Sequence, residues 1–107
     1  MSRKGDIREM AGYVGNSAAH VATYHEEAEK EVGVYMEIVS GIAEKRTWNE
    51  REIEDFKERA VRRADSVIKE RIKRGDLNEK EFDETLERAR EYIGEFVKGE
   101  LKANQDT

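Results

Sequence analysis

The sequence predicts an all-α protein, a bundle of three main helices in which the long first helix dimerises into a larger helical bundle. The chain contains no proline, so its helices can run without interruption. Apolar residues recur at spacings of three and four along most of its length, as one face of a helix requires. Two N-cap signals and one glycine divide it into predicted helices at about 6–45, 49–74 and 78–102, with flexible ends at 1–5 and 103–107.

Composition predicts one domain, residues 1–107, without a membrane segment. The 25 acidic and 20 basic residues nearly cancel to a net charge of −5, which together with the regular apolar spacing argues against disorder. Because the chain has no cysteine, a disulfide framework and a thiolate nucleophile are excluded, and we expect a cytoplasmic protein. We find no apolar run that would span a membrane and no signal segment. The high content of Glu, Lys and Arg is also typical of thermophilic proteins.

The predicted first helix carries an apolar seam of the kind found in coiled coils. Its positions alternate spacings of four and three over five heptads, and several of them are small, which lets a neighbouring helix approach closely. Because two shorter helices cannot cover a helix of this length, we predict that the seam is the interface of a homodimer or larger homo-oligomer. The predicted interface consists of Ile7, Ala11, Val14, Ala18, Val21, His25, Ala28, Val32, Tyr35, Val39 and Ile42.

Two alternatives for this first segment stay open. One is a break near "GYVGNS", with Ser17 as a fresh N-cap. The other makes "VGVYMEIV", residues 32–39, a strand, because Val, Tyr and Ile favour sheets, although no second strand is in view.

The middle and last predicted helices begin with the same capping device. Asn49 is followed three residues later by Glu52, and Asn78 is followed in the same way by Glu81, which is the pattern of a capping box. Gly75 fits the left-handed residue that closes the middle helix. "WNEREIEDFKERA" and "LNEKEFDETLERA" match at six of thirteen positions, so an old repeat is one explanation and shared capping chemistry is the other.

Both histidines and four glutamates fall within "HVATYHEEAEKE", residues 20–31, which raises the question of a metal site. His20 and His25 are five residues apart, about 140° around a helix, so they cannot share one ion as an i, i+4 pair would. Glu29 stands where the zinc-protease helix motif needs a second histidine. We therefore predict no metal and no cofactor, with His25 turned inward on the seam and His20 outward beside Tyr24.

Four carboxylates resemble the magnesium-binding strings of helical nucleotide pyrophosphohydrolases of the dimeric dUTPase type. Glu26 and Glu29 match E-x-x-E, and Glu52 with Asp55 matches E-x-x-D on the next predicted helix. The resemblance implies a magnesium-dependent nucleotide hydrolase. Chance alone supplies roughly three E-x-x-E windows in a chain with 19 glutamates, and capping already explains Glu52.

The middle helix is the basic part of an acidic chain. Residues 57–74 hold eight bases and three acids. A face that tracks the phosphates of a nucleic acid is one interpretation. A salt-bridged surface is the other, because acids precede bases by four residues, and no aromatic residue is interleaved with the bases for stacking. The predicted nucleic-acid face consists of Arg59, Arg62, Arg63, Lys69 and Lys73, and the predicted pairs are Asp55/Arg59, Glu58/Arg62, Asp65/Lys69 and Glu70/Arg74.

These observations favour a small interaction or scaffolding module that acts through helix–helix self-association. The alternatives are a nucleic-acid-binding adaptor that uses the middle helix and a magnesium-dependent nucleotide pyrophosphohydrolase. No nucleophile motif or phosphate loop is present, so an enzyme is the less favoured class. A second copy of the chain is the expected partner, with another protein or a nucleic acid as further candidates.

Overall fold

Residues 3–105 form four α-helices and three short helical turns. The computed structural model describes the backbone of residues 3–105 and the side chains of residues 7–105. The elements are α1 (Arg3–Tyr24), α2 (Glu26–Glu44), α3 (Glu50–Lys73), η1 (Glu79–Glu81), α4 (Phe82–Phe96), η2 (Val97–Leu101) and η3 (Lys102–Asn104). The all-α prediction is confirmed. Residues 32–39 lie within α2, so the strand alternative is wrong, and within residues 3–105 the β-structure is limited to one isolated bridge.

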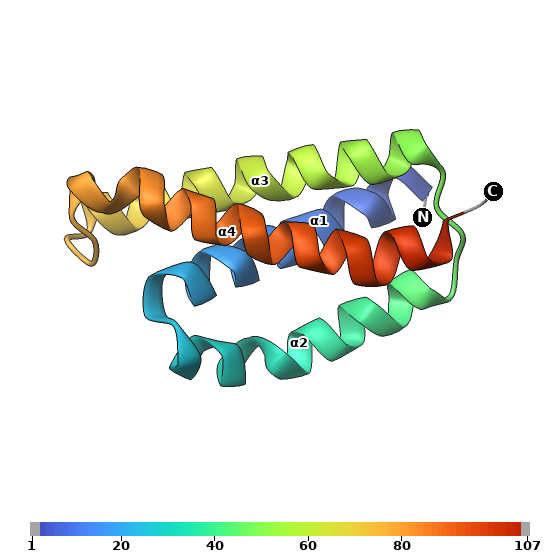
Figure 1. The fold of residues 1–107 in the computed structure, drawn as a ribbon, viewed down its shortest axis with the longest axis horizontal. Helices are drawn as coiled ribbons and strands as arrows, with labels where there is room; N and C mark the ends of the chain where they lie inside the picture. Colours follow the sequence, from blue (N-terminus) through green and yellow to red (C-terminus); the bar gives the residue numbers. More distant parts are fainter. Residues whose placement is uncertain (1–2, 106–107) are drawn as a thin grey trace.

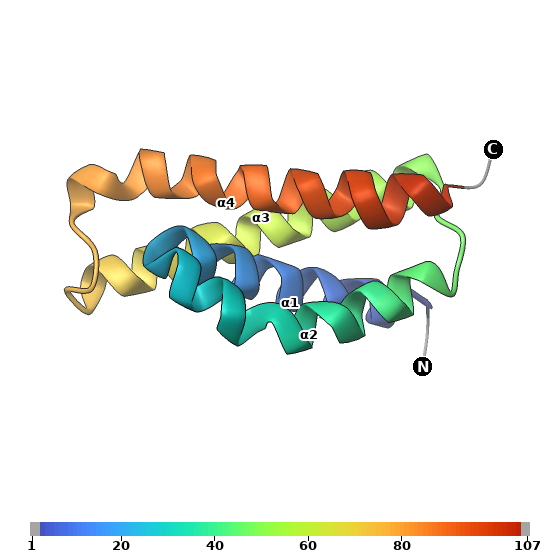
Figure 2. The ribbon, with the colours of Figure 1, turned by 60° about the horizontal axis from the view of Figure 1, so that its bottom comes forward.

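The four α-helices run back and forth along one axis. Helices α1 and α3 run in one direction, while α2 and α4 run in the other (Figures 1 and 2). Helix α1 packs most extensively on α3 and also contacts α2 and α4. Helix α2 rests mainly on α1 and, near its C-terminal end, on η2. It is therefore the outer helix, and one of its faces is turned away from the core.

The predicted continuous helix over residues 6–45 is wrong, because the chain turns back at His25. This residue has φ 59° and ψ −133°, and α1 and α2 lie on either side of it. A straight helix of 40 residues would extend about 60 Å, well beyond the 43 Å longest dimension of the molecule. Folding back lets α2 bury Val39 and Ala43 in the same core as α1. The alternative break near Ser17 is also wrong, since α1 continues through it.

The ends of α3 lie where local capping chemistry predicts them. The Asn49 side chain accepts a hydrogen bond from the Glu52 N–H at 2.8 Å, and the Glu52 carboxylate accepts one from the Asn49 N–H at 3.1 Å. Gly75 has φ 83° and donates its N–H to the Ile72 carbonyl at 3.0 Å, while Asp76 donates to the Arg71 carbonyl at 2.9 Å. These two bonds form a Schellman motif, which terminates the helix.

The predicted last helix is present as three successive elements. The second capping box, Asn78 with Glu81, opens the 3₁₀ turn η1, which leads directly into α4 and then into the π-helical turn η2. The predicted flexible ends are wrong for residues 3–5, which lie in α1, and for residues 103–104, which lie in η3. Residues 1–2 and 106–107 lie outside the described residues.

A buried aromatic cluster joins the α2–α3 connection to the C-terminal turns. Trp48 is fully buried, and its indole N–H donates to the Ala43 carbonyl at 3.1 Å, while its backbone N–H donates to the Asn104 carbonyl at 3.0 Å. The Trp48 ring meets Phe56 edge-on at 5.7 Å, and Phe56 stacks on Phe96 at 5.8 Å. The rest of the core is built mainly from small and β-branched residues, which lets α1 lie close to α3 and α4.

Candidate functional site

The predicted seam does not form one continuous surface. Seven of its members are buried within the chain, namely Ile7, Ala11, Val14, Ala18, Ala28, Val32 and Val39. The four residues in α1 and Val39 of α2 belong to one core cluster, because the turn at His25 folds α2 back against α1. Val21 is half-buried, and His25, Tyr35 and Ile42 are exposed. The buried seven are therefore not available to a second copy.

Helix α2 exposes an apolar surface that contains Tyr35 and Ile42 of the seam together with two residues outside it, and we call this surface the α2 face. Its members are Val34, Tyr35, Ile38 and Ile42, with exposed fractions of 65, 62, 59 and 47%. Spacings of one, four and eight residues from Val34 place all four side chains on one side of the helix. Single exposed apolar side chains are common on protein surfaces, but four large ones together on one side of a helix are typical of an interaction surface.

Charged residues of opposite sign flank the α2 face at its two ends. Glu31 lies seven residues before Ile38, and Lys45 lies seven residues after it, so both continue the same side of the helix. The Glu31 carboxylate also contacts Nε2 of His20 at 2.8 Å but keeps 66% of its side chain exposed. Lys45 is the C-cap of α2 and is exposed.

An open cleft of about 320 Å³ borders the α2 face on the side of α1. It is lined by Tyr13, Asn16, Ser17, His20, Val32, Tyr35 and Arg71. Nη2 of Arg71 lies 3.5 Å from Nδ1 of His20, and a guanidinium can only donate, so Nδ1 accepts and Nε2–H donates to Glu31. Tyr13 is 56% exposed and extends the apolar surface from Tyr35 onto α1.

The two histidines lie in different surroundings, as their spacing predicts. His20 meets the Tyr24 ring edge-on at 5.0 Å, as predicted, but its side chain is only 26% exposed and lines the cleft instead of pointing outward. His25 is exposed at the turn, so the prediction that it faces inward is wrong. Among the described residues, no group of three histidine or carboxylate side chains is placed to hold a metal ion.

The four carboxylates of the pyrophosphohydrolase alternative do not come together. Glu26 and Glu29 lie in the first turn of α2, whereas Glu52 and Asp55 lie near the start of α3 at the opposite end of the molecule (Figure 1). Glu52 is engaged by the N-cap and, at 2.6 Å, by Arg46. Asp55 is bonded to Arg59. One magnesium ion cannot bind both pairs in this arrangement.

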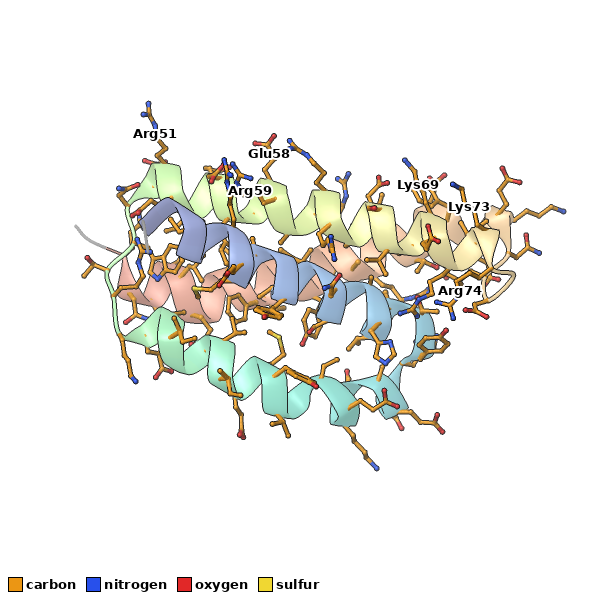
Figure 3. The ribbon with its side chains drawn as sticks, turned by 180° about the vertical axis from the view of Figure 1, so that it is seen from behind. Arg51, Glu58, Arg59, Lys69, Lys73 and Arg74 are labelled. Carbon is orange, nitrogen blue, oxygen red and sulfur yellow. The ribbon has the colours of Figure 1, made fainter. Side chains whose placement is uncertain are left out.

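Several cations on the basic side of α3 form ion pairs with nearby carboxylates. The predicted pairs Asp55/Arg59, Glu58/Arg62 and Asp65/Lys69 are present at 2.9, 2.8 and 2.9 Å, whereas Arg74 contacts Asp76 at 3.6 Å rather than Glu70. Figure 3 shows Glu58, Lys69 and Lys73 on the outer side of this helix. Its use as a nucleic-acid surface stays a prediction.

The fold and the α2 face together define the class of molecule: a small all-α protein that exposes a group of large apolar side chains on one side of α2. Comparison with protein-family models, with curated proteins and with solved structures finds no match for this chain. Within residues 3–105, no helix is both long enough and apolar enough to cross a membrane. Function therefore has to be inferred from the surfaces themselves.

The predicted interface includes two members of the α2 face, Tyr35 and Ile42, but not Val34 and Ile38, because the seam follows one helical register through His25. Val34 and Ile38 lie off that register, although Ile38 widens the apolar side of the segment. The sequence does contain a signal for the α2 face. Two neighbouring columns of apolar residues run along a segment whose charged residues are mainly acidic.

Proposed function

We propose that this protein is an interaction module that self-associates through the α2 face, pairing α2 with α2 of a second copy in an antiparallel, two-fold symmetric dimer. The observation that carries the proposal is the symmetry of the face about Ile38. Val34 and Ile42 lie four residues on either side of Ile38, and Glu31 and Lys45 lie seven residues on either side.

Such a pattern is self-complementary when two copies run in opposite directions. With Ile38 opposite Ile38 of the second copy, Val34 faces the second Ile42, and Glu31 faces the second Lys45. Each dimer then contains two contacts between Val34 and Ile42 and two ion pairs between Glu31 and Lys45. A parallel pairing would place Glu31 against Glu31 and Lys45 against Lys45, which repel.

The energetics support a dimer of moderate affinity. Burying the exposed parts of four apolar side chains on each copy contributes roughly 1–2 kcal/mol per side chain. Lost rotational and translational freedom offsets much of this gain. We expect a Kd of about 1–100 μM, which suits a reversible scaffold contact. We propose that the protein acts in the cytoplasm. This compartment suits a chain that contains no cysteine and so builds no disulfide framework.

The first test is the solution mass, measured by size-exclusion chromatography with light scattering at protein concentrations from about 5 to 500 μM. We expect the mass to rise from monomer to dimer across this range. Ile38→Glu should leave a monomer at every concentration, because it places a charge at the centre of the pairing. Lys73→Glu, which changes an exposed residue of α3, is the control and should dimerise as the native protein does.

The second test is an exchange of charges, which probes the antiparallel register. Glu31→Lys and Lys45→Glu should each weaken dimerisation, whereas the double variant should restore it, because residues 31 and 45 face each other only between antiparallel copies. Helicity of each variant is checked by circular dichroism. A monomeric native protein at the highest concentration, or a dimer that Ile38→Glu leaves intact, would contradict the proposal.

A further inference from the structure

A second surface, formed by α1 and α3 without α2, gathers four arginines in one cleft. This cleft, which we call the arginine cleft, is open to solvent and has a volume of about 340 Å³. Its lining residues are Arg8, Gly12, Arg59, Arg62, Arg63 and Ser66. The two α1 residues are four apart, and the α3 residues follow spacings of three, one and three, so each helix contributes a single side. Four cations in one cleft are unexpected in a chain of net charge −5.

Two glycines of α1 shape this cleft in opposite ways. At Gly15, an added Cβ would lie 2.5 Å from the Ala60 carbonyl oxygen and 2.7 Å from the Arg63 Cβ, so the missing side chain lets α1 and α3 approach closely. At Gly12, an added Cβ would meet nothing within 4 Å. Gly12 therefore leaves open space in the cleft wall, and the close contact at Gly15 holds the two arginine-bearing helices together beside it.

The carboxylates around the arginine cleft neutralise only half of its positive charge. Asp55 pairs with Arg59, and Glu58 pairs with Arg62. Arg63 donates from Nε to the neutral side-chain oxygen of Asn16 at 2.8 Å, and within the described residues Arg8 forms no ion pair. Among the side chains of residues 7–105, four guanidinium groups and two carboxylates leave a local charge of +2. An anion with two negative charges would balance it.

We propose that the arginine cleft binds a small phosphate-bearing anion, such as a phosphomonoester or a diphosphate. Guanidinium groups present a planar fork of donors that matches phosphate oxygens, and a phosphate group carries a charge near −2. The Ser66 hydroxyl adds a neutral donor or acceptor. Because the cleft is open, the remainder of a phosphorylated molecule projects into solvent, so the phosphate group is the part that this site recognises.

The direct test is isothermal titration calorimetry with inorganic pyrophosphate at about 100 mM NaCl, a salt concentration that screens weak surface attraction. We expect saturable binding at one site per chain. The double variant Arg8→Gln/Arg63→Gln removes the two arginines without carboxylate partners and should weaken binding about tenfold or more. The matched control is Arg51→Gln/Lys73→Gln, which removes the same charge elsewhere on α3 (Figure 3) and should change affinity about twofold at most.

A second variant tests the cleft without altering its charge. Gly12→Gln places a side chain in the open space of the cleft and keeps all four arginines, and no neighbour lies within 4 Å of its Cβ. It should weaken pyrophosphate binding about tenfold while the circular dichroism spectrum and thermal stability remain those of a folded protein.

Three results would overturn the proposal. The first is no pyrophosphate binding at concentrations up to about 10 mM. The second is an equal loss in the control and cleft variants, which would show general attraction to a basic helix. The third is binding of a single-stranded oligonucleotide without binding of pyrophosphate, which would support the nucleic-acid prediction for α3 and remove the small-anion site.

Discussion

At the scale of single residues, Gly15 shows how a missing side chain positions two helices. Helix α1 lies so close to α3 that a Cβ at residue 15 would overlap the Ala60 carbonyl oxygen. A backbone oxygen in a helix cannot move aside without disturbing its own hydrogen bonding. Gly12, one turn earlier, has free space around the same position. An added side chain is therefore accommodated at residue 12 but not at residue 15.

We expect Gly15→Ala to lower the free energy of unfolding by about 2 kcal/mol, because the added methyl group forces α1 and α3 apart. Gly12→Ala should instead raise it by about 0.5–1 kcal/mol, because alanine restricts the unfolded chain and nothing obstructs its Cβ. Urea denaturation monitored by circular dichroism measures both values. Equal effects of the two substitutions would show that the close contact between the helices is absent.

At the scale of elements, the turn at His25 decides how α1 and α2 are arranged. A residue with φ 59° and ψ −133° is in a region that only glycine adopts easily, and such strain costs about 1–3 kcal/mol. No proline and no glycine stand at this turn, and helix-forming residues surround it. The turn persists because α2 buries Ala28, Val39 and Ala43 when it folds back.

We expect His25→Gly to raise the free energy of unfolding by about 1 kcal/mol. The free energy gained when the backbone strain is relieved exceeds the cost of the conformational entropy that glycine loses on folding. Glu27→Gly, two residues later within α2, is the matched control and should lower it by about 1 kcal/mol. If residue 25 lay inside a continuous helix, His25→Gly would be as destabilising as the control. Chemical denaturation of the three proteins distinguishes the two cases.

At the scale of the whole molecule, the last turn of α2 is held against η2 by a contact that depends on pH. Burial raises the pKa of the Glu100 carboxyl above its ordinary value, and the nearby Glu44 carboxylate raises it further, while a hydrogen bond from Ser40 opposes both. The folded state therefore binds this proton more tightly than the unfolded chain does. Its contribution to stability is present at low pH and is lost as pH rises through the raised pKa.

We expect Glu100→Gln to be more stable than the native protein at neutral pH, because it removes the repulsion from Glu44. The difference should disappear as pH falls below the ordinary glutamate pKa of about 4.3, because Glu100 is then protonated in both the folded and the unfolded state. Thermal melts between about pH 3 and pH 8 measure this difference. Glu37→Gln, on the exposed part of α2, is the control, and a gain that persists at the lowest pH would contradict the assignment to Glu100.

The parts of the structure that could be predicted from the sequence are those that depend on neighbouring residues. The capping boxes at Asn49 and Asn78 and the left-handed Gly75 are interactions within about five residues, so the short sequence pattern specifies them. Three of the four predicted ion pairs on α3 formed for the same reason. The all-α class followed from the apolar periodicity, which needs no knowledge of the partner helices.

Tertiary structure alone decided the turn at His25 and the surfaces that result from it. The heptad pattern through this residue is locally consistent with one long helix, and only burial of α2 against α1 makes the strained turn favourable. The α2 face stays exposed because α2 rests mainly on one neighbour, and the arginine cleft exists because Gly15 brings α1 against α3. Both surfaces depend on contacts between residues far apart in the chain, and helical periodicity contains no information about those contacts.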